Sequence, residues 1–287
     1  MEELIKKYYK ITNITNYKTY YNIICFMDNK KSLYILESIQ NRKYIIDIYK
    51  ELINNTDYTI IKNIYGNSYT NIYGIDYILI KCNKIRYNPI NNQKKIYNLK
   101  ANNSLNKINW IYLWIKKIDY YEYQQKHIKD YKFLIDSLNY YLGMGEIAVN
   151  YIKYNLRNTS IPLVISHKRI SKDNLYNPEN IILDYRARDV SQYLKYLFFE
   201  TEYRYFNFDK FLKMTNFTRD DYILLYGRLL FPCFYFDLYD EIVNSSLNQK
   251  DIIKIISRSE EYEAYVDMIY NKIIKITHIP KIDWINN

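Results

Sequence analysis

The amino-acid sequence predicts an α+β fold with two lobes, a small mixed N-terminal lobe and a larger, mainly helical C-terminal lobe. Up to about residue 82, aromatic and β-branched segments typical of strands surround one segment with helical spacing, and from residue 108 amphipathic helical stripes follow one another. Residues 83–107 are rich in Asn and Lys and lack periodicity, which is typical of a long connection or insert. We therefore predict an N-lobe over 1–82, a connection over 83–107 and a helical C-lobe over 108–287.

The expected elements of the small lobe are short. Residues 17–28 predict a strand or hairpin, because aromatic and β-branched side chains dominate there. Residues 33–54 carry apolar side chains on mostly helical spacing and predict a helix. The segments 58–64, 69–73 and 76–82 then predict a three-stranded meander.

The larger lobe is expected to be built from amphipathic helices. The first begins near residue 108, and its predicted buried face consists of isoleucines flanked by aromatic residues: Ile108, Ile111, Ile115 and Ile118, with Trp110, Trp114 and Tyr121. Two shorter helices, 133–142 and 146–156, are predicted on either side of Gly143-Met144-Gly145. Clear helical stripes follow over 190–198 and 262–273, and we interpret them as core-facing.

The charge balance does not predict a nucleic-acid partner. The chain has 41 Lys and Arg against 31 Asp and Glu, a formal net charge of +10. The basic residues are spread along the chain in pairs such as Lys6-Lys7 and never form a tract, whereas a nucleic-acid module gathers them on one face. The abundance of Lys, Asn, Ile and Tyr is typical of an AT-rich genome, which accounts for part of the positive charge.

The cysteines and the N-terminus predict a cytoplasmic chain. Cys25, Cys82 and Cys233 lie far apart and lack the spacing of metal sites, so we expect small buried thiols in a reducing compartment. The first residues lack the apolar region of a signal peptide. No stretch approaches about 18 apolar residues without a charge, so we expect no membrane span.

The segment most informative about function begins at His167. Kinase-like phosphotransferases build their catalytic loop as H-x-D-x-x-x-x-N, followed by a strand that ends in a metal-binding Asp. His167 is followed at that spacing by Asn174, and an apolar run ends in Asp184. The catalytic acid is replaced by Arg169, and a guanidinium cannot accept a proton at physiological pH. We therefore predict a degenerate loop of His167, Arg169 and Asn174 without a catalytic residue.

Two further parts of a kinase are missing from the sequence. The five glycines lie outside any first hairpin, so no Gly-rich phosphate loop is expected, and residues 21–27 contain no lysine. Asn174 and Asp184 remain as vestigial candidates for a divalent metal ion, although Mg²⁺ binds weakly without phosphates to complete its coordination. We favour the alternative in which Arg169 forms an ion pair with Asp184 and closes the site.

Six segments of the chain resemble, in order, segments of the YutH/CotS group of endospore coat-associated proteins from Bacillota, which is related to aminoglycoside and choline phosphotransferases. They are residues 110–119 (WIYLWIKKID), 140–151 (YYLGMGEIAVNY), 166–169 (SHKR), 183–189 (LDYRARD), 225–236 (LYGRLLFPCFYF) and 279–284 (IPKIDW). The resemblance is specific over about 105–287 and rests on pattern alone over 1–104. It implies a protein-kinase-like, aminoglycoside phosphotransferase-like fold, and it implies that the Arg in place of the catalytic Asp is the group's own departure from active enzymes.

The preferred functional hypothesis is a catalytically degenerate kinase-like protein that uses no cofactor and acts by association with other proteins. The resemblance implies that spore coat components are among these partners and that the protein is associated with the coat. The alternative is an active small-molecule phosphotransferase of the aminoglycoside or choline kinase type, which uses ATP and Mg²⁺ with Asp173 as a displaced carboxylate. A third hypothesis, a nucleic-acid binder, requires an affinity that falls steeply with salt.

Overall fold

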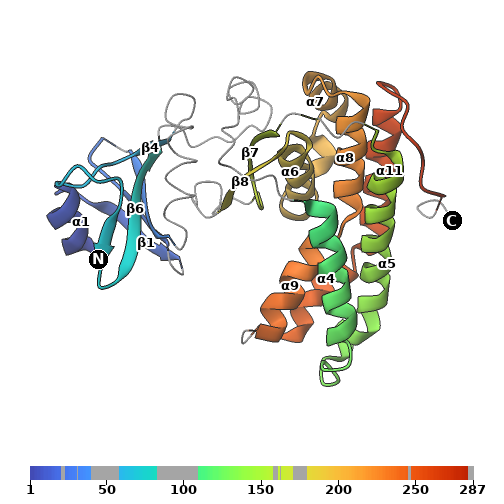
Figure 1. Cartoon of the computed structure of the whole chain (residues 1–287), viewed down its shortest axis with the longest axis horizontal. Coiled ribbons are helices and arrows are strands. Elements are labelled where there is room, and N and C mark those ends of the chain that lie inside the picture. The colour runs from blue at the N-terminus through green and yellow to red at the C-terminus, as the bar shows by residue number, and fades with distance from the viewer. Residues whose placement is uncertain are drawn as a thin grey trace. The chain divides into compact units, whose positions relative to one another are not determined.

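The computed structural model describes residues 1–20, 23–30, 32–39, 58–82, 109–157, 161, 163–170, 180–244 and 247–283 (Figure 1). The chain divides by its contacts into two compact units. The first, called the sheet unit, comprises Met1–Lys107 and Leu163–Asp184, and the second, called the helical unit, comprises Ile108–Pro162 and Tyr185–Asn287. The contacts group residues 163–184 with the first unit, whereas the sequence analysis placed them in a C-lobe over 108–287. The domain limits expected from the sequence stay a prediction.

The sheet unit contains an antiparallel, six-stranded sheet in the order β1-β2-β3-β6-β4, with β5 also paired to β6. Its elements are α1 (Glu2–Tyr9), β1 (Thr15–Tyr20), β2 (Ile23–Met27), β3 (Leu33–Ser38), β4 (Tyr58–Ile60), β5 (Thr70–Ile72) and β6 (Ile75–Cys82). The same unit contains a separate strand pair, β7 (Leu163–His167) and β8 (Ile181–Tyr185).

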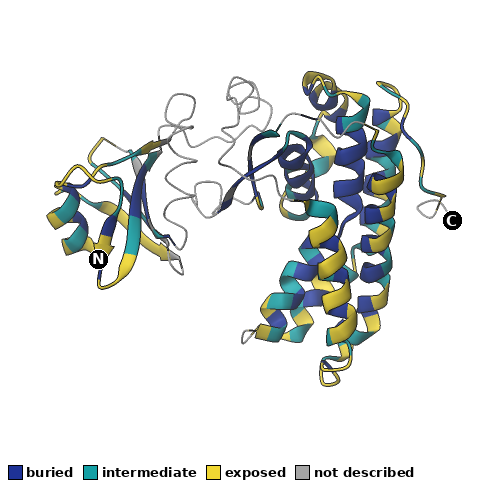
Figure 2. Cartoon of the chain, viewed as in Figure 1, coloured by how far each residue is buried: buried dark blue, intermediate teal, exposed yellow. Residues whose placement is uncertain are grey.

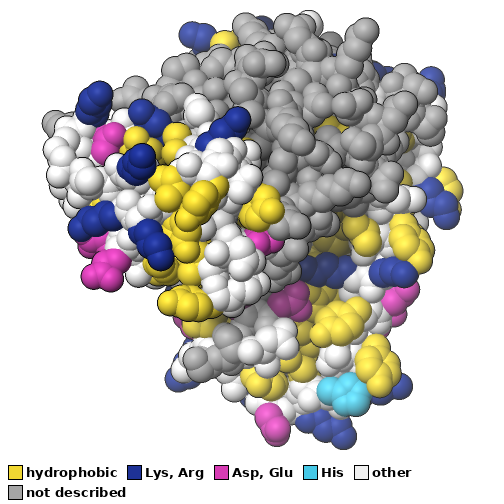
Figure 3. All heavy atoms as spheres, turned by 60° about the vertical axis from the view of Figure 1, so that its left-hand side comes forward, with side chains coloured by type: hydrophobic (Ala, Val, Ile, Leu, Met, Phe, Trp, Pro, Cys, Tyr) yellow, Lys and Arg dark blue, Asp and Glu magenta, His cyan; other side chains and the backbone are white. Residues whose placement is uncertain are grey.

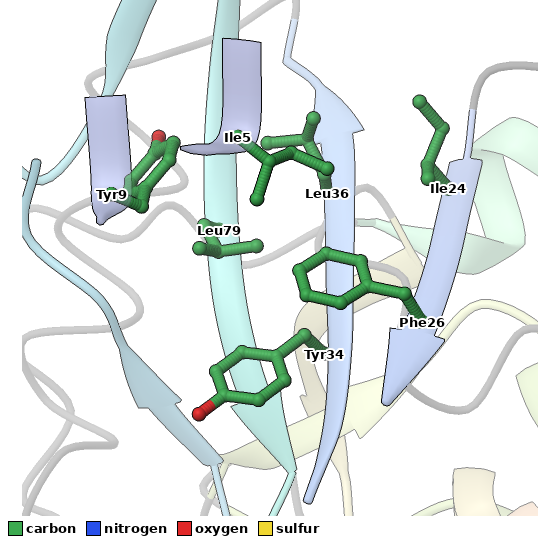
Figure 4. Close-up of a cluster of buried hydrophobic side chains, with 7 residues drawn as sticks. All are labelled: Ile5, Tyr9, Ile24, Phe26, Tyr34, Leu36 and Leu79. Carbon is green, nitrogen blue, oxygen red and sulfur yellow. The ribbon is translucent and has the colours of Figure 1, made fainter. Parts of the chain in front are cut away.

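Helix α1 covers one face of the six-stranded sheet (Figure 4). A buried cluster joins this helix to β2, β3 and β6, and it consists of Ile5, Tyr9, Ile24, Phe26, Tyr34, Leu36 and Leu79. The rings of Phe26 and Tyr34 stack with their centroids 5.2 Å apart. Along β3 and β6, the residues that alternate with this cluster, among them Ile35, Ile78 and Ile80, are buried as well. Both central strands are therefore buried on their two faces.

The structure corrects the helix predicted over residues 33–54. Residues 33–38 form strand β3, and from residue 40 onwards the predicted helix lies outside the described residues. Because β3 lies between β2 and β6 and is buried on both faces, its apolar residues follow one another without alternation, and such a run cannot be told from a helix by spacing alone. The predicted meander is also wrong, since β4 and β5 both pair with β6.

The helical unit consists of helices that bury their apolar faces against one another, as Figure 2 shows. They are α4 (Trp110–Gln124), α5 (Lys132–Asn155), α6 (Ala187–Glu200), α7 (Phe208–Met214), α8 (Arg219–Leu230), α9 (Cys233–Asn244), α10 (Ile253–Ile256) and α11 (Ser259–Ile273), with short 3₁₀ turns η2 (Tyr203–Tyr205) and η3 (Gln249–Ile252). Helix α8 packs against both α5 and α6, and α4 packs against α5. Among the described residues, no helix is both long enough and apolar enough to cross a lipid bilayer.

Helix α5 replaces the two helices predicted over 133–142 and 146–156. It runs without a break through Gly143 and Gly145. A Cβ on Gly145 would lie 3.3 Å from Ile118 Cδ1, so this glycine serves the close approach of α4 and α5. Gly145 therefore indicates close packing of two helices rather than a chain reversal.

The buried face of α4 also differs from the prediction. It consists of Trp114, Ile118 and Tyr121, whereas Ile115 is 39% exposed. Trp114 stacks on Phe231 with ring centroids 4.2 Å apart. Aromatic rings bury more area than isoleucine. Trp114 and Tyr121, together with Ile118, lie at i, i+4 and i+7 and so set the orientation of the helix. The stripes predicted in α6 and α11 are confirmed as core-facing, apart from a half-buried Tyr193.

Many of the 37 tyrosines belong to the core of the helical unit. A tyrosine can be buried at low cost when its hydroxyl finds an acceptor. Tyr262 donates to the carbonyl oxygen of Leu229 at 2.7 Å, and Tyr265 donates to that of Leu194 at 2.8 Å. These side chains tie α11 to α8 and α6 by polar contacts inside an otherwise apolar interior.

Candidate functional site

The residues singled out in the sequence lie on and beside the strand pair β7–β8. His167 is the last residue of β7, Asp184 lies in β8, and these two residues are 5% and 1% exposed. Arg169 follows β7 and is half-buried. The structure thus brings His167 and Asp184 onto two paired strands. Asn174, the other predicted member of the site, lies outside the described residues.

Asn180 joins the two ends of the loop between these strands, and the sequence analysis missed it. Its carbonyl oxygen accepts a hydrogen bond from Lys168 N at 2.7 Å. Its side-chain oxygen accepts one from Arg169 N at 2.9 Å, and its side-chain nitrogen donates to Arg169 O at 2.7 Å. Asn180 is 6% exposed, so these bonds are shielded from water. An Asn before an apolar run predicts only a turn, and the sequence carries no signal for this pairing across the loop.

The two side-chain hydrogen bonds, which we call the Asn180 clamp, hold the main chain of Arg169, the residue at the predicted position of the catalytic acid. One guanidinium N–H of Arg169, from Nη1, donates to the carbonyl oxygen of Lys168 at 2.8 Å. At this position of the loop the chain presents a donor, where phosphoryl transfer to a hydroxyl requires a proton acceptor. The ion pair between Arg169 and Asp184 stays a prediction.

Among the described residues, no group of three or more His, Cys, Asp or Glu side chains could hold a metal ion. Asp184 is the only one of the two predicted metal ligands that lies within the described ranges. The predicted site of Asn174 and Asp184 therefore stays a prediction.

An ion pair joins the start of α6 to the start of α8. Arg186, just before α6, pairs with Asp221 in the first turn of α8, where Asp221 is 1% exposed. Asp221 also accepts a hydrogen bond from Thr218 N at 2.8 Å and completes a capping box with the Thr218 side chain. Asp189 lies in the first turn of α6, where the helix dipole favours a negative charge.

Three of the segments that carry the family resemblance meet inside the helical unit. Arg188 places its guanidinium carbon 4.0 Å from the ring centre of Trp110. Arg228 lies 5.5 Å from the same ring and 5.6 Å from that of Trp114. Arg188 and Arg228 are 2% and 4% exposed. The described contacts of these segments are packing contacts, in which a guanidinium is buried against an aromatic face.

A family model settles the relationship. The model described as "Spore coat putative kinase YutH" matches residues 2–269 of this chain. The chain belongs to this family. It is 26% identical over 208 residues to the endospore coat-associated protein YutH of Bacillus subtilis (strain 168), an alignment that covers 61% of each protein. The chain thus spans about three fifths of the length of that relative.

Solved structures show the fold. An aminoglycoside phosphotransferase from Alicyclobacillus acidocaldarius superposes with a TM-score of 0.65 at 12% identity, covering 94% of this chain and 95% of that one. An ethanolamine kinase from Plasmodium vivax superposes with a TM-score of 0.56 at 12% identity, covering 90% and 83%. Both the predicted family and the predicted two-lobed, aminoglycoside phosphotransferase-like fold are confirmed.

Proposed function

We propose that this chain is a catalytically degenerate member of the kinase-like fold that acts by association with other proteins of the spore coat. The observation that carries the proposal is Arg169 at the position of the catalytic acid, with its main chain clamped by Asn180. The clamp fixes the main chain of Arg169 at the start of the loop, and its two neighbours in the sequence, Lys168 and Ile170, are not acids. An Arg stays protonated, and no proton can be accepted there.

The first strands of the sheet unit support the same proposal. In kinases a Gly-rich loop covers the phosphates and a lysine on the third strand contacts them. Here Tyr20 pairs with Ile23, so only residues 21 and 22, Tyr and Asn in the sequence, connect β1 and β2. Strand β3 has the sequence LYILES and contains no lysine. These residues supply neither a glycine-rich loop nor a β3 lysine for the phosphates of a nucleoside triphosphate.

The proposed association rests on the family and on the surface. The Bacillus subtilis relative is named for its association with the endospore coat. Large aromatic side chains are exposed on the helical unit, among them Tyr123 at 63%, Tyr154 at 78% and Tyr205 at 91%. Figure 3 shows exposed hydrophobic side chains interspersed with charged ones on the described parts of the chain. Tyrosine supplies contact area together with a polar end, which is typical of protein interfaces.

A thermal-shift titration with ATP and Mg²⁺ tests the loss of catalysis. A ligand that binds the folded state raises the melting midpoint, and at a hundred times its Kd it adds about 2.7 kcal/mol of stability. We expect a flat titration to millimolar ATP, with an active aminoglycoside phosphotransferase as the positive control. A rising midpoint together with transfer of the γ-phosphate to a hydroxyl acceptor would establish the alternative, an active phosphotransferase.

Fractionation of spores tests the association. In the source organism, or in a sporulating host that carries the gene, we expect the chain in the coat extract rather than in the core fraction. The matched variant Tyr123→Ser/Tyr154→Ser removes exposed rings without touching the buried core and should reduce the coat-bound amount. Recovery of the folded parent chain from the core fraction, and not from the coat extract, would contradict the proposed association.

A further inference from the structure

One side of α4 is exposed to solvent although it carries large apolar side chains (Figure 2). The buried side of this helix consists of Trp114, Ile118 and Tyr121. The opposite side carries five apolar residues that are 39–63% exposed, namely Tyr112, Leu113, Ile115, Tyr120 and Tyr123. Exposed apolar patches of this kind are typical of contact surfaces.

Two charged residues, Lys116 and Asp119, lie exposed among these apolar side chains. We call the central residues of this face the α4 stripe, and they are Tyr112, Ile115, Lys116, Asp119, Tyr120 and Tyr123. Their spacing of three and four residues places them along one side of the helix. Leu113 and Glu122 lie at the two borders of the stripe.

The α4 stripe has the same pattern when it is read from either end: an aromatic residue, an apolar residue and a charge. The pairs at equal distance from its midpoint are Tyr112 with Tyr123, Ile115 with Tyr120, and Lys116 with Asp119. Where two identical surfaces meet across a twofold axis, residue i contacts residue j and j contacts i. If two copies of α4 lie antiparallel with their midpoints together, the two residues of each pair lie at the same level. The stripe is therefore complementary to itself.

The central charges of the stripe are not neutralised within the chain. The Nζ atom of Lys116 lies 4.5 Å from the ring centre of Tyr112, and none of the described acids pairs with it. The Asp119 carboxylate forms no ion pair or hydrogen bond within the described ranges. In the antiparallel arrangement Lys116 is level with the partner's Asp119, and it is offset along the axis by about 4.5 Å from the partner's Lys116. Opposite charges are thus closer than like charges.

The charge of α4 as a whole also favours contact between copies on this helix. The chain has a formal net charge of +10, so two copies repel each other overall. Helix α4 carries two lysines and two acids, which are Lys116, Lys117, Asp119 and Glu122. Lys117 points to the inside of the unit, where it contacts Asp237 at 3.4 Å. Two copies can therefore approach through α4 at a place where the local charges balance.

We propose that the α4 stripe is a self-association surface, on which a second copy of this chain docks with its own α4 antiparallel. The aromatic ends pack against each other, and the two contacts of Lys116 with the partner's Asp119 fix the register. A contact through one helix of each copy buries less than the ~1,200 Å² of a standard interface, so the dimer is weak and reversible. The inference goes beyond the proposed function, because the partner is a second copy of this chain and not another protein of the coat.

Sedimentation equilibrium of the full chain measures the dimer. At low salt we expect the average mass to rise from one chain toward two between about 10 µM and about 1 mM, the range of a weak interface. The association should weaken at high salt, because exposed charges are screened. The mass of one chain at every concentration would overturn the proposal and would assign the stripe to a partner of different chemistry.

Charge exchange tests the surface and its register. Lys116→Glu sets two acids at the same level, and Asp119→Lys sets two lysines there, so each variant should weaken self-association at least about tenfold. A mixture of the two variants should form a dimer again, because each carries the charge that the other lacks. The double variant Lys116→Glu/Asp119→Lys restores opposite charges at both contacts and should associate like the parent.

Lys153→Glu is the matched control. Lys153 of α5 is also an exposed lysine beside a ring, with its Nζ atom 6.0 Å from the ring centre of Tyr154, and its exchange should leave the association unchanged. Circular dichroism checks that each variant is folded. Association of both single variants as tight as that of the parent would overturn the proposal. A single variant that does not fold leaves the double variant as the test, and a monomeric double variant would reject the antiparallel register.

Discussion

The two units use the segments that carry the family resemblance in different ways. In the helical unit, these segments supply buried contacts such as Arg188 on Trp110 and Trp114 on Phe231. In the sheet unit, the strand pair β7–β8 carries the start and the end of the segment that we propose to be a degenerate catalytic loop, with Arg169 at the proposed position of the acid. A buried guanidinium or ring cannot be lost without leaving an unpaired charge or a void, whereas a catalytic carboxylate adds nothing to packing. The proposed loss of chemistry is therefore compatible with a fold that persists.

The largest expected effect distinguishing the two units is their response to alkali. The helical unit contains Tyr262 and Tyr265, whose pKa values burial raises well above 10.0. In the sheet unit, burial and then the hydrogen bond to Asp28 raise the pKa of Tyr34 to about 12. A folded pKa above the unfolded one means that the stabilising effect is complete below about pH 10 and is lost as pH rises through the folded value. We expect cooperative unfolding above about pH 10, led by the helical unit.

Tryptophan fluorescence measures this response for the helical unit alone, because Trp110, Trp114 and Trp284 all belong to it. Tyrosine ionisation, followed by absorbance, should coincide with the change in tryptophan emission. Gradual ionisation of all tyrosines near their ordinary pKa, with unchanged emission, would contradict the assignment of these tyrosines to the core.

The next largest effect is expected from Asp221→Ala. The change leaves Arg186 without its carboxylate partner in a site where Asp221 is 1% exposed, and it removes the capping box of α8. Breaking a buried pair costs about 3–5 kcal/mol. Urea unfolding followed by tryptophan fluorescence measures the loss. Asp209→Ala, which breaks the exposed pair with Lys272, is the control and should leave the midpoint unchanged.

Two glycines of the helical unit test how tightly its helices pack. A Cβ on Gly227 of α8 would lie 2.4 Å from Ile152 Cγ1 of α5, whereas a Cβ on Gly143 would meet nothing within 4 Å. Gly227→Ala should therefore destabilise by about 1–3 kcal/mol through overpacking. Gly143→Ala should stabilise by about 0.5–1 kcal/mol, because alanine favours a helix interior. Equal effects of the two changes in urea unfolding would show that the α5–α8 contact can relax.

These glycines also show what the sequence could and could not predict. The stripes of α6 and α11 were predictable, because one buried face repeats at helical spacing along an otherwise polar helix. The continuity of α5 and the strand at 33–38 were not, since a glycine that admits a neighbouring helix looks like a stop and a strand buried on both faces shows no alternation. At the site, the spacing of His167 and Asp184 was visible, but the Asn180 clamp depends on a partner across a loop.

In the sheet unit, Asn180→Ala tests whether the clamp sets the start of the loop. Two partly buried hydrogen bonds to the main chain of Arg169 are lost, each of which contributes about 0.5–1.5 kcal/mol net. Asn180→Asp is the matched comparison: it keeps the acceptor for Arg169 N but sets a carboxylate oxygen against Arg169 O in place of a donor, so it should cost at least as much as Asn180→Ala while the Arg169 N–H bond is kept. Hydrogen exchange of the Arg169 amide is the sharper measurement. Unchanged protection of that amide in Asn180→Ala would show that the loop start is held by other contacts.

The smallest expected effect concerns activity in Arg169→Asp, which restores a carboxylate at the position of the catalytic acid. We expect no transfer of phosphate from ATP to any hydroxyl acceptor, because β3 carries no lysine and a two-residue connection joins β1 to β2. A radiolabelled ATP assay with aminoglycosides and choline measures this. Loss of stability that Mg²⁺ partly restores would support the predicted contact of Arg169 with Asp184, since two acids make a site rich in oxygen ligands. Turnover of ATP by this variant would show that one residue separates the chain from an active enzyme. The proposal that the sheet unit has lost catalysis, while the helical unit retains its packing, would then be wrong.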